Sequence, residues 1–93
     1  ERALIELRAV ESQRDGQARV LAATEALLAA EQRRFEIGES SLLLVNLRER
    51  ALLDERQRSA QLEARRAAAL GAVAAALGAP ELLTLADVDR PRR

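Results

Sequence analysis

The feature that most constrains the fold is the absence of proline from residues 1–79. Ala, Leu, Arg, Glu and Gln dominate this stretch, and they have the strongest intrinsic preferences for the α-helix. Proline inside a helix removes a hydrogen bond and clashes with the preceding turn, so its absence permits long uninterrupted helices. Only the segment Glu36-Ile37-Gly38-Glu39-Ser40-Ser41 reads as a turn. The sequence therefore predicts two long helices joined by one short connection.

Turn chemistry sets the expected boundaries. Gly38 can adopt positive φ at a helix end, and Ser40 or Ser41 can cap the next helix. Gly78 and Pro80 favour a second stop. The expected organisation is a first helix over 1–36, a hairpin tip over 37–41, a second helix over 42–78, and a C-terminal tail over 79–93 that is partly disordered apart from a possible short helical turn.

Apolar residues recur along both helices at close to heptad spacing. A second stripe, which includes Val20 and Leu27, lies beside the first, so the apolar face is wider than one two-helix seam needs. We therefore predict an all-α fold, a long antiparallel helical hairpin resembling a coiled coil, that self-associates into a helical bundle. The residues expected to pack the helices are Leu21, Leu28, Phe35, Leu42, Val45, Leu52, Leu70, Val73 and Leu77.

Composition narrows the possible functions. The 15 basic residues, all arginine, balance 15 acidic residues, and neither sign is concentrated as a nucleic-acid partner would require. The chain contains no Cys and no His, so the usual nucleophile–base pairs and most transition-metal sites are missing. Phe35 is the only aromatic residue and is better explained by packing than by ligand binding. We expect no catalytic activity, no metal and no cofactor.

The ends and the hydropathy of the chain suggest a piece of a larger protein. It begins at Glu1 without Met, directly in helical pattern, and no signal peptide is visible. No apolar run approaches the roughly 18 residues of a membrane-spanning helix. We therefore expect a soluble fragment excised from a longer parent.

The stretch Phe35-Glu36-Ile37-Gly38-Glu39-Ser40-Ser41-Leu42-Leu43-Leu44-Val45-Asn46 resembles the hairpin tip of TolC-like outer membrane factors, the outer membrane efflux proteins. In that family an aromatic residue and a glycine close one helix, and a Ser or Thr and a Leu/Val cluster open the next. The later segments Ala51-Leu52-Leu53 and Ala76-Leu77-Gly78 are also similar to the family pattern. The resemblance covers roughly residues 18–80.

The resemblance implies a trimeric parent embedded in the outer membrane by a β-barrel, with a long helical barrel in the periplasm. This chain would be one of the two α-hairpins of each subunit, more similar to the second. Its tip would dock a periplasmic adaptor protein, and through it an inner-membrane transporter for efflux. The docking residues would be Ile37, Gly38, Glu39, Ser40 and Ser41.

Three sets of alternatives stay open. The tip residues could serve only as a stop-and-cap turn, because generic glycine–serine turns have the same composition. The chain could instead be the α-hairpin of a periplasmic adaptor (membrane fusion) protein, or an unrelated antiparallel coiled-coil interaction module. A membrane-surface helix is disfavoured, since such helices carry a basic face opposite Trp or Phe. The polar segment 54–66 could face a wet channel lumen.

Overall fold

A computed structural model describes residues 2–78 of the chain, and these form two helices. Helix α1 spans Arg2–Glu36, 35 residues, and helix α2 spans Leu42–Leu77, 36 residues. The described residues include no strand, so the predicted all-α helical hairpin is confirmed. The predicted tail over 79–93, with its possible helical turn, lies outside the described residues.

Helix α1 ends where a glycine enters the left-handed region. Gly38 has a φ of 80°, and its N–H donates to the carbonyl of Phe35 at 3.1 Å. The N–H of Glu39 reaches back to the carbonyl of Arg34 at 2.7 Å. These two bonds form a Schellman motif, which satisfies carbonyls that a helix end otherwise leaves unpaired. The glycine is needed because a residue with a Cβ is strained at this φ.

Helix α2 begins with a serine cap. The hydroxyl of Ser41 accepts a hydrogen bond from the N–H of Leu44 at 3.2 Å, and the Ser41 carbonyl accepts the N–H of Val45 at 3.1 Å. This is the arrangement of an N-cap residue, three positions before the donor that its side chain satisfies. At the other end of α2, Gly78 follows the last helical residue with a φ of 65°, as expected of a glycine stop.

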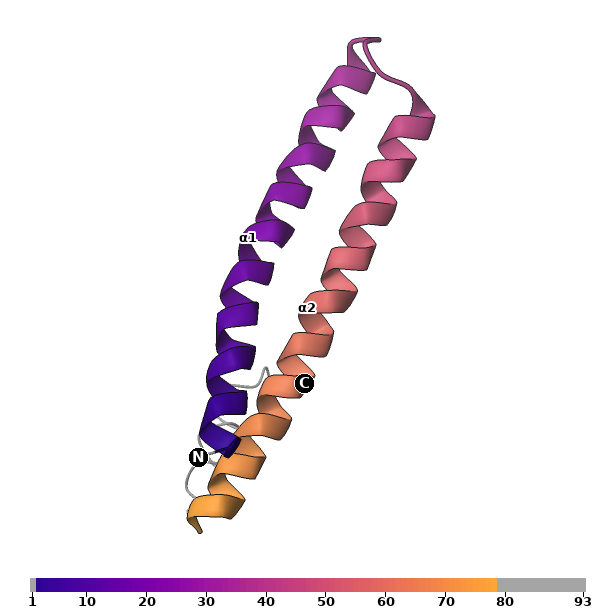
Figure 1. Ribbon diagram of the computed structural model, residues 1–93. Coiled ribbons are helices and arrows are strands. Elements are labelled where there is room, and N and C mark those ends of the chain that lie inside the picture. The colour runs from indigo at the N-terminus through magenta and orange to yellow at the C-terminus, as the bar shows by residue number, and fades with distance from the viewer. Residues whose placement is uncertain (1, 79–93) are drawn as a thin grey trace. The chain divides into compact units, whose positions relative to one another are not determined.

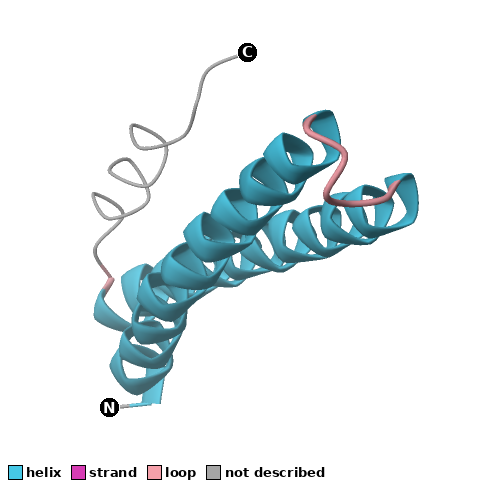
Figure 2. Ribbon diagram, turned by 90° about the horizontal axis from the view of Figure 1, so that it is seen from above, coloured by secondary structure: helices cyan, strands magenta, loops and turns pink. Residues whose placement is uncertain are grey.

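The described chain divides into two compact units. The tip unit, residues 15–61, contains the second part of α1, the connection and the first part of α2. Within it the two helices run antiparallel, side by side, and the connection crosses from one to the other (Figures 1 and 2). The terminal unit contains residues 2–14 of α1 and 62–78 of α2.

Small side chains dominate the buried part of the terminal unit. Val10 is fully buried, and Ala69, Val73 and Ala74 are nearly so. Alanine lets two helix backbones approach closely, which compensates for the lack of large core side chains. Arginines from α2 pair with carboxylates of α1 at the edges: Arg65 contacts Glu6 at 3.4 Å and Arg66 contacts Glu11 at 3.8 Å. Arg65 and Glu6 are both exposed, and an exposed pair of this kind contributes only about 0.2–1 kcal/mol.

The seam of the tip unit contains more polar than apolar residues. Apart from Gly and Ala, the least exposed side chains of each helix recur at alternating spacings of three and four residues, the spacing of a coiled-coil seam. In α1 these are Gln17, Leu21, Thr24, Leu28 and Glu31, and in α2 they are Val45, Arg48, Leu52, Glu55 and Ser59. The large apolar residues left exposed in this unit are Val20, Leu27, Phe35, Ile37, Leu42, Leu43, Leu44, Leu47 and Leu53.

The residues expected to pack the helices therefore occupy different environments. Val45, Leu52 and Val73 are buried, and Leu21, Leu28 and Leu70 are half-buried. Phe35, Leu42 and Leu77 are exposed. The exposed members of the set lie at the ends of the helices, where the partner helix covers less of the surface.

Candidate docking tip

The hairpin tip, residues 37–41, presents both apolar and polar atoms to solvent. Ile37 is 69% exposed, a high value for a large aliphatic side chain. Gly38, Glu39 and Ser41 are also exposed, whereas Ser40 is half-buried. Of the five residues predicted to form a docking surface, four therefore lie on the outside, and Ser40 points inward instead.

Open space surrounds the backbone at Gly38. A Cβ built on this residue would meet no atom within 4 Å. The glycine is thus required by its φ and not by crowding within the chain. The absence of a side chain also leaves the backbone at the apex open to the approach of another molecule.

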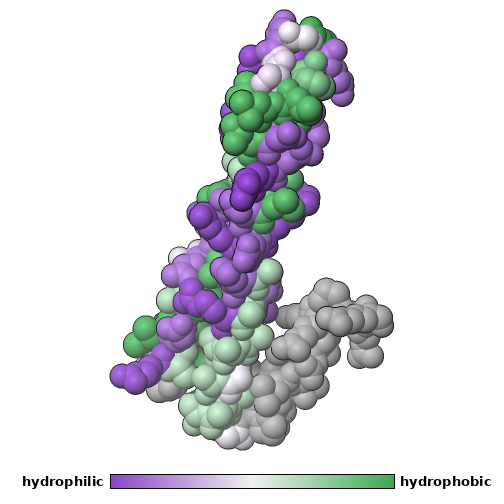
Figure 3. Space-filling view, turned by 90° about the vertical axis from the view of Figure 1, so that its right-hand side faces the viewer, coloured by the Kyte–Doolittle hydropathy of each residue, from purple (hydrophilic) through white to green (hydrophobic). Residues whose placement is uncertain are grey.

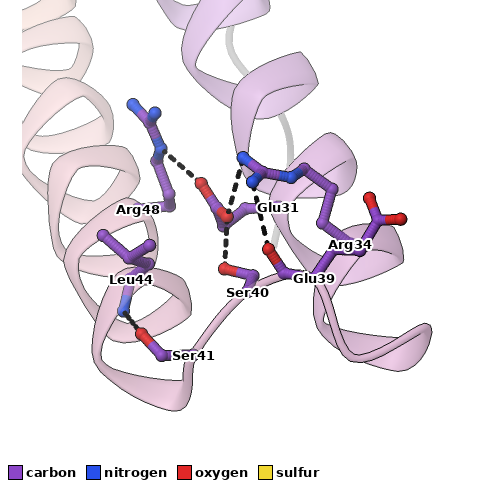
Figure 4. Close-up of polar contacts among 7 residues, drawn as sticks. All are labelled: Glu31, Arg34, Glu39, Ser40, Ser41, Leu44 and Arg48. Carbon is purple, nitrogen blue, oxygen red and sulfur yellow. Dashed lines mark hydrogen bonds and ion pairs between the residues drawn. The ribbon is translucent and has the colours of Figure 1, made fainter.

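Glu31 is the buried carboxylate beneath the tip. It lies in α1 with only 4% of its surface exposed, and it accepts a hydrogen bond from the Ser40 hydroxyl. Arg48 of α2 donates its Nε to the other carboxylate oxygen at 3.4 Å, and an Arg34 nitrogen lies 3.6 Å away. Figure 4 shows these contacts converging on Glu31 from α1, the tip and α2.

The surroundings of Glu31 favour its ionised form. The hydrogen bond from Ser40 lowers the pKa of Glu31 below its ordinary value of 4.5, and the hydrogen bond and charge of Arg48 and the charge of Arg34 act in the same direction. Burial opposes them, because it disfavours a charge, but the net pKa shift is downward. Glu31 is therefore a carboxylate near neutral pH, stabilised by hydrogen bonds from Ser40 and Arg48 and by an ion pair with Arg34.

A second side-chain contact, made by Arg34, connects the tip to the end of α1. The Arg34 side chain donates to the carbonyl of Glu39 at 3.0 Å, next to the backbone bond between the same two residues (Figure 4). Arg34 thus contacts both the tip backbone and Glu31. Together with the Ser40–Glu31 bond, this contact fixes the connection on the side that faces the helices.

Apolar surface continues from the tip along the start of α2. Leu42, Leu43, Leu44 and Leu47 are all exposed. In Figure 3, which views the molecule from the side of α2, apolar atoms gather just below the tip. Single exposed leucines are ordinary, but large apolar side chains gathered on one surface are typical of an interaction site.

A shallow recess lies further along α2, lined by Glu49, Leu52, Leu53 and Arg56 of α2 and by Leu28 of α1. The four α2 residues have the spacing i, i+3, i+4, i+7, which is the outline of a hole for a knob from a neighbouring helix. The recess is apolar in its middle and carries one acidic and one basic residue at its ends.

Neither Glu31 nor Arg48 was among the residues expected to form the site. Each occupies a seam position by spacing: Glu31 follows Leu28 by three residues and precedes Phe35 by four. That spacing is the signal that could have identified Glu31, because a charged residue at the position that follows Leu28 in the seam must find a partner when it is buried. The sequence also left the cap ambiguous, and the structure assigns it to Ser41, while Ser40 binds Glu31.

Among residues 2–78, no group of three or more acidic side chains is placed to hold a metal ion. In the same part of the chain, neither helix is long and apolar enough to cross a membrane.

Comparisons with protein-family models, with curated proteins and with solved structures each found no match. The resemblance to outer membrane factors therefore rests on the sequence segments given above, and the function is argued from the geometry of the tip unit.

Proposed function

We propose that this chain is a periplasmic helical-barrel segment of a trimeric TolC-like outer membrane efflux channel, whose tip docks a periplasmic adaptor protein. The role is structural, a wall and a contact surface, and it requires no catalytic group or cofactor. The adaptor would link the channel to an inner-membrane transporter, and the parent would be anchored in the outer membrane.

The observation that carries this proposal is the distribution of polar and apolar side chains in the tip unit. Polar residues such as Gln17, Glu31 and Glu55 occupy the seam, whereas Leu27, Leu47 and other large apolar residues lie outside it. An isolated hairpin gains most from the opposite arrangement, because burial of apolar area is the main favourable term in folding. The distribution supports a hairpin whose outer faces pack against neighbouring helices, as in a helical barrel.

The tip adds support for docking. Ile37 projects from the connection, and Leu42 and Leu43 extend the apolar surface at the start of α2. The open backbone at Gly38 permits close approach of a second hairpin tip. Interfaces concentrate their binding energy in a few apolar anchors surrounded by polar atoms, and Ile37 beside Glu39 has this character.

Site-specific cross-linking tests the docking, because the chain has no cysteine of its own. We would introduce Ile37→Cys at the tip and, as the matched control, Gln57→Cys on exposed α2, and load each with a photoactivated maleimide in cells that make the protein. The expected result is a cross-link from position 37, and not from 57, to an adaptor that itself binds an inner-membrane transporter.

Two other results would overturn the proposal. A tip-specific cross-link to an outer membrane channel would identify this chain as the hairpin of an adaptor. A failure of position 37 to give any product that the control lacks would remove the docking claim and favour an unrelated coiled-coil module.

A further inference from the structure

We propose that Glu31 is a positioning residue for the tip: its carboxylate holds residues 37–41 against the end of α1 and the start of α2, so that the tip is presented in a single conformation. This inference deepens the docking role proposed above, and only the importance of the conformation for binding rests on that role. The conformation itself is a property of the described chain.

The geometry gives Glu31 contacts with every segment that meets at the tip. Ser40 donates from the connection, Arg48 donates from α2 at 3.4 Å, and Arg34 lies 3.6 Å away on α1 itself. The two Schellman bonds fix Gly38 and Glu39 relative to α1 only. Glu31 is the group that joins the connection to α2 as well, because the Ser40 and Arg48 contacts meet on one carboxylate.

A stabilising role alone does not explain a carboxylate at this place. Position 31 belongs to the seam and is 4% exposed, so a leucine there would bury apolar area without any desolvation of a charge. Replacing a buried ionic group by an apolar one is often neutral or stabilising, and the best-attested use of such groups is to specify one arrangement among several. This reasoning favours a role for Glu31 in positioning the tip over a role in stability.

The interaction of Glu31 with the tip should weaken when the pH is lowered. The charged groups that face Glu31 are Arg34 from α1 and Arg48 from α2, and arginine does not lose its proton in this range. Only the carboxylate itself titrates, and its pKa is lowered in the folded chain. A group with a lowered folded pKa contributes at neutral pH, and its contribution is lost as the pH falls through that lowered pKa, below 4.5.

Amide hydrogen exchange of the 93-residue chain, resolved by NMR, tests the proposal at the Gly38 and Glu39 amides. Glu31→Leu and Ser40→Ala should each lower the protection factors of these amides by about tenfold, as expected when a hydrogen bond to a charged group is lost. Ser40→Thr keeps the hydroxyl and should restore protection. Glu36→Gln removes an exposed carboxylate at the last residue of α1 and serves as the matched control, with no change expected.

The Glu31→Leu variant distinguishes a role in positioning the tip from a role in stabilising the whole hairpin. We expect its helical content and urea midpoint to equal or exceed those of the parent chain while the tip amides lose protection. In the parent chain and in Glu36→Gln, the protection factors of the tip amides should decrease when the pH is lowered below 4.5. In Glu31→Leu they should show no such decrease. Unchanged tip protection in both Glu31→Leu and Ser40→Ala would overturn the proposal, as would a loss in Glu31→Leu that merely follows global unfolding.

The exchange measurement needs no partner, so its failure is distinct from failure of the docking role. If position 37 gives no adaptor cross-link and the variants still loosen the tip, the proposed function fails and the positioning role stands. If the cross-link forms and the variants leave the tip unchanged, the docking stands and the positioning role fails.

Discussion

The adjacent leucines Leu52 and Leu53 offer a direct test of which surface stabilises the hairpin itself and which stabilises its association with other copies. Leu52 is 7% exposed in the seam, and Leu53 is 63% exposed on the outer face. Truncation to alanine removes the same atoms from the same helix, so differences in helix propensity cancel. At about 0.8 kcal/mol per buried methylene, Leu52→Ala should lower the free energy of unfolding by about 2 kcal/mol, and Leu53→Ala by less than about 1 kcal/mol.

The assay is urea unfolding followed by circular dichroism over a range of chain concentrations, with sedimentation at the same concentrations. At low concentration the loss for Leu52→Ala should exceed the loss for Leu53→Ala. At high concentration the parent chain should gain stability by self-association, as mass action requires, and Leu53→Ala should lose that gain. Equal losses of unfolding free energy for the two variants at low concentration would refute the assignment of Leu52 to the seam. A parent chain that stays monomeric, with its midpoint independent of concentration, would refute the lateral packing.

Three further perturbations test the details of the tip unit. Gly38→Ala should cost about 1–2 kcal/mol of unfolding free energy because of its positive φ, and Gly38→Asn should cost less, since the added Cβ meets nothing in either case. Ser41→Ala should cost about 1 kcal/mol by loss of the cap and should fray the first turn of α2, which backbone chemical shifts would show. Gln17→Leu removes two hydrogen bonds of 3.0 Å to Glu55 and leaves that half-buried carboxylate without this donor, so it should cost about 1 kcal/mol in urea unfolding. Glu31→Leu differs because it removes the buried charge itself, and Gln32→Leu on the exposed face should cost nothing.

Local chemistry made the fold predictable. The connection depends on the steric freedom of Gly38 and the short polar side chain of Ser41, and both act on their immediate neighbours in the chain. Helix ends of this kind can be read without knowledge of any distant contact. The expected boundaries at residues 36 and 42 coincide with the observed end of α1 and start of α2 for this reason.

The choice of buried face was not predictable in the same way. Helix α1 carries two apolar stripes that differ by one residue, represented by Leu28 in one and Leu27 in the other. Neighbouring residues on a helix lie about 100° apart, so either stripe could face the partner. The structure turns Leu28 toward α2, and this rotation brings Glu31 into the seam while Leu27 stays outside. The rotation depends on contacts such as Glu31–Arg48, which join residues far apart in the sequence.

This rotation also explains how the two helices can pair in a single register while their outer faces stay suited to assembly. A seam filled only with leucine would satisfy the hairpin in several registers, because one apolar layer is much like the next. The contacts of Glu31 with Arg48 and of Gln17 with Glu55 pair particular residues of the two helices, and a shifted register would leave a buried polar group unpaired. The polar seam therefore selects the arrangement of the tip, and the apolar residues are left free on the outside. If neighbouring hairpins supply the missing burial, stability and arrangement are controlled by different surfaces, so a change at Leu53 alters assembly while a change at Glu31 alters the tip.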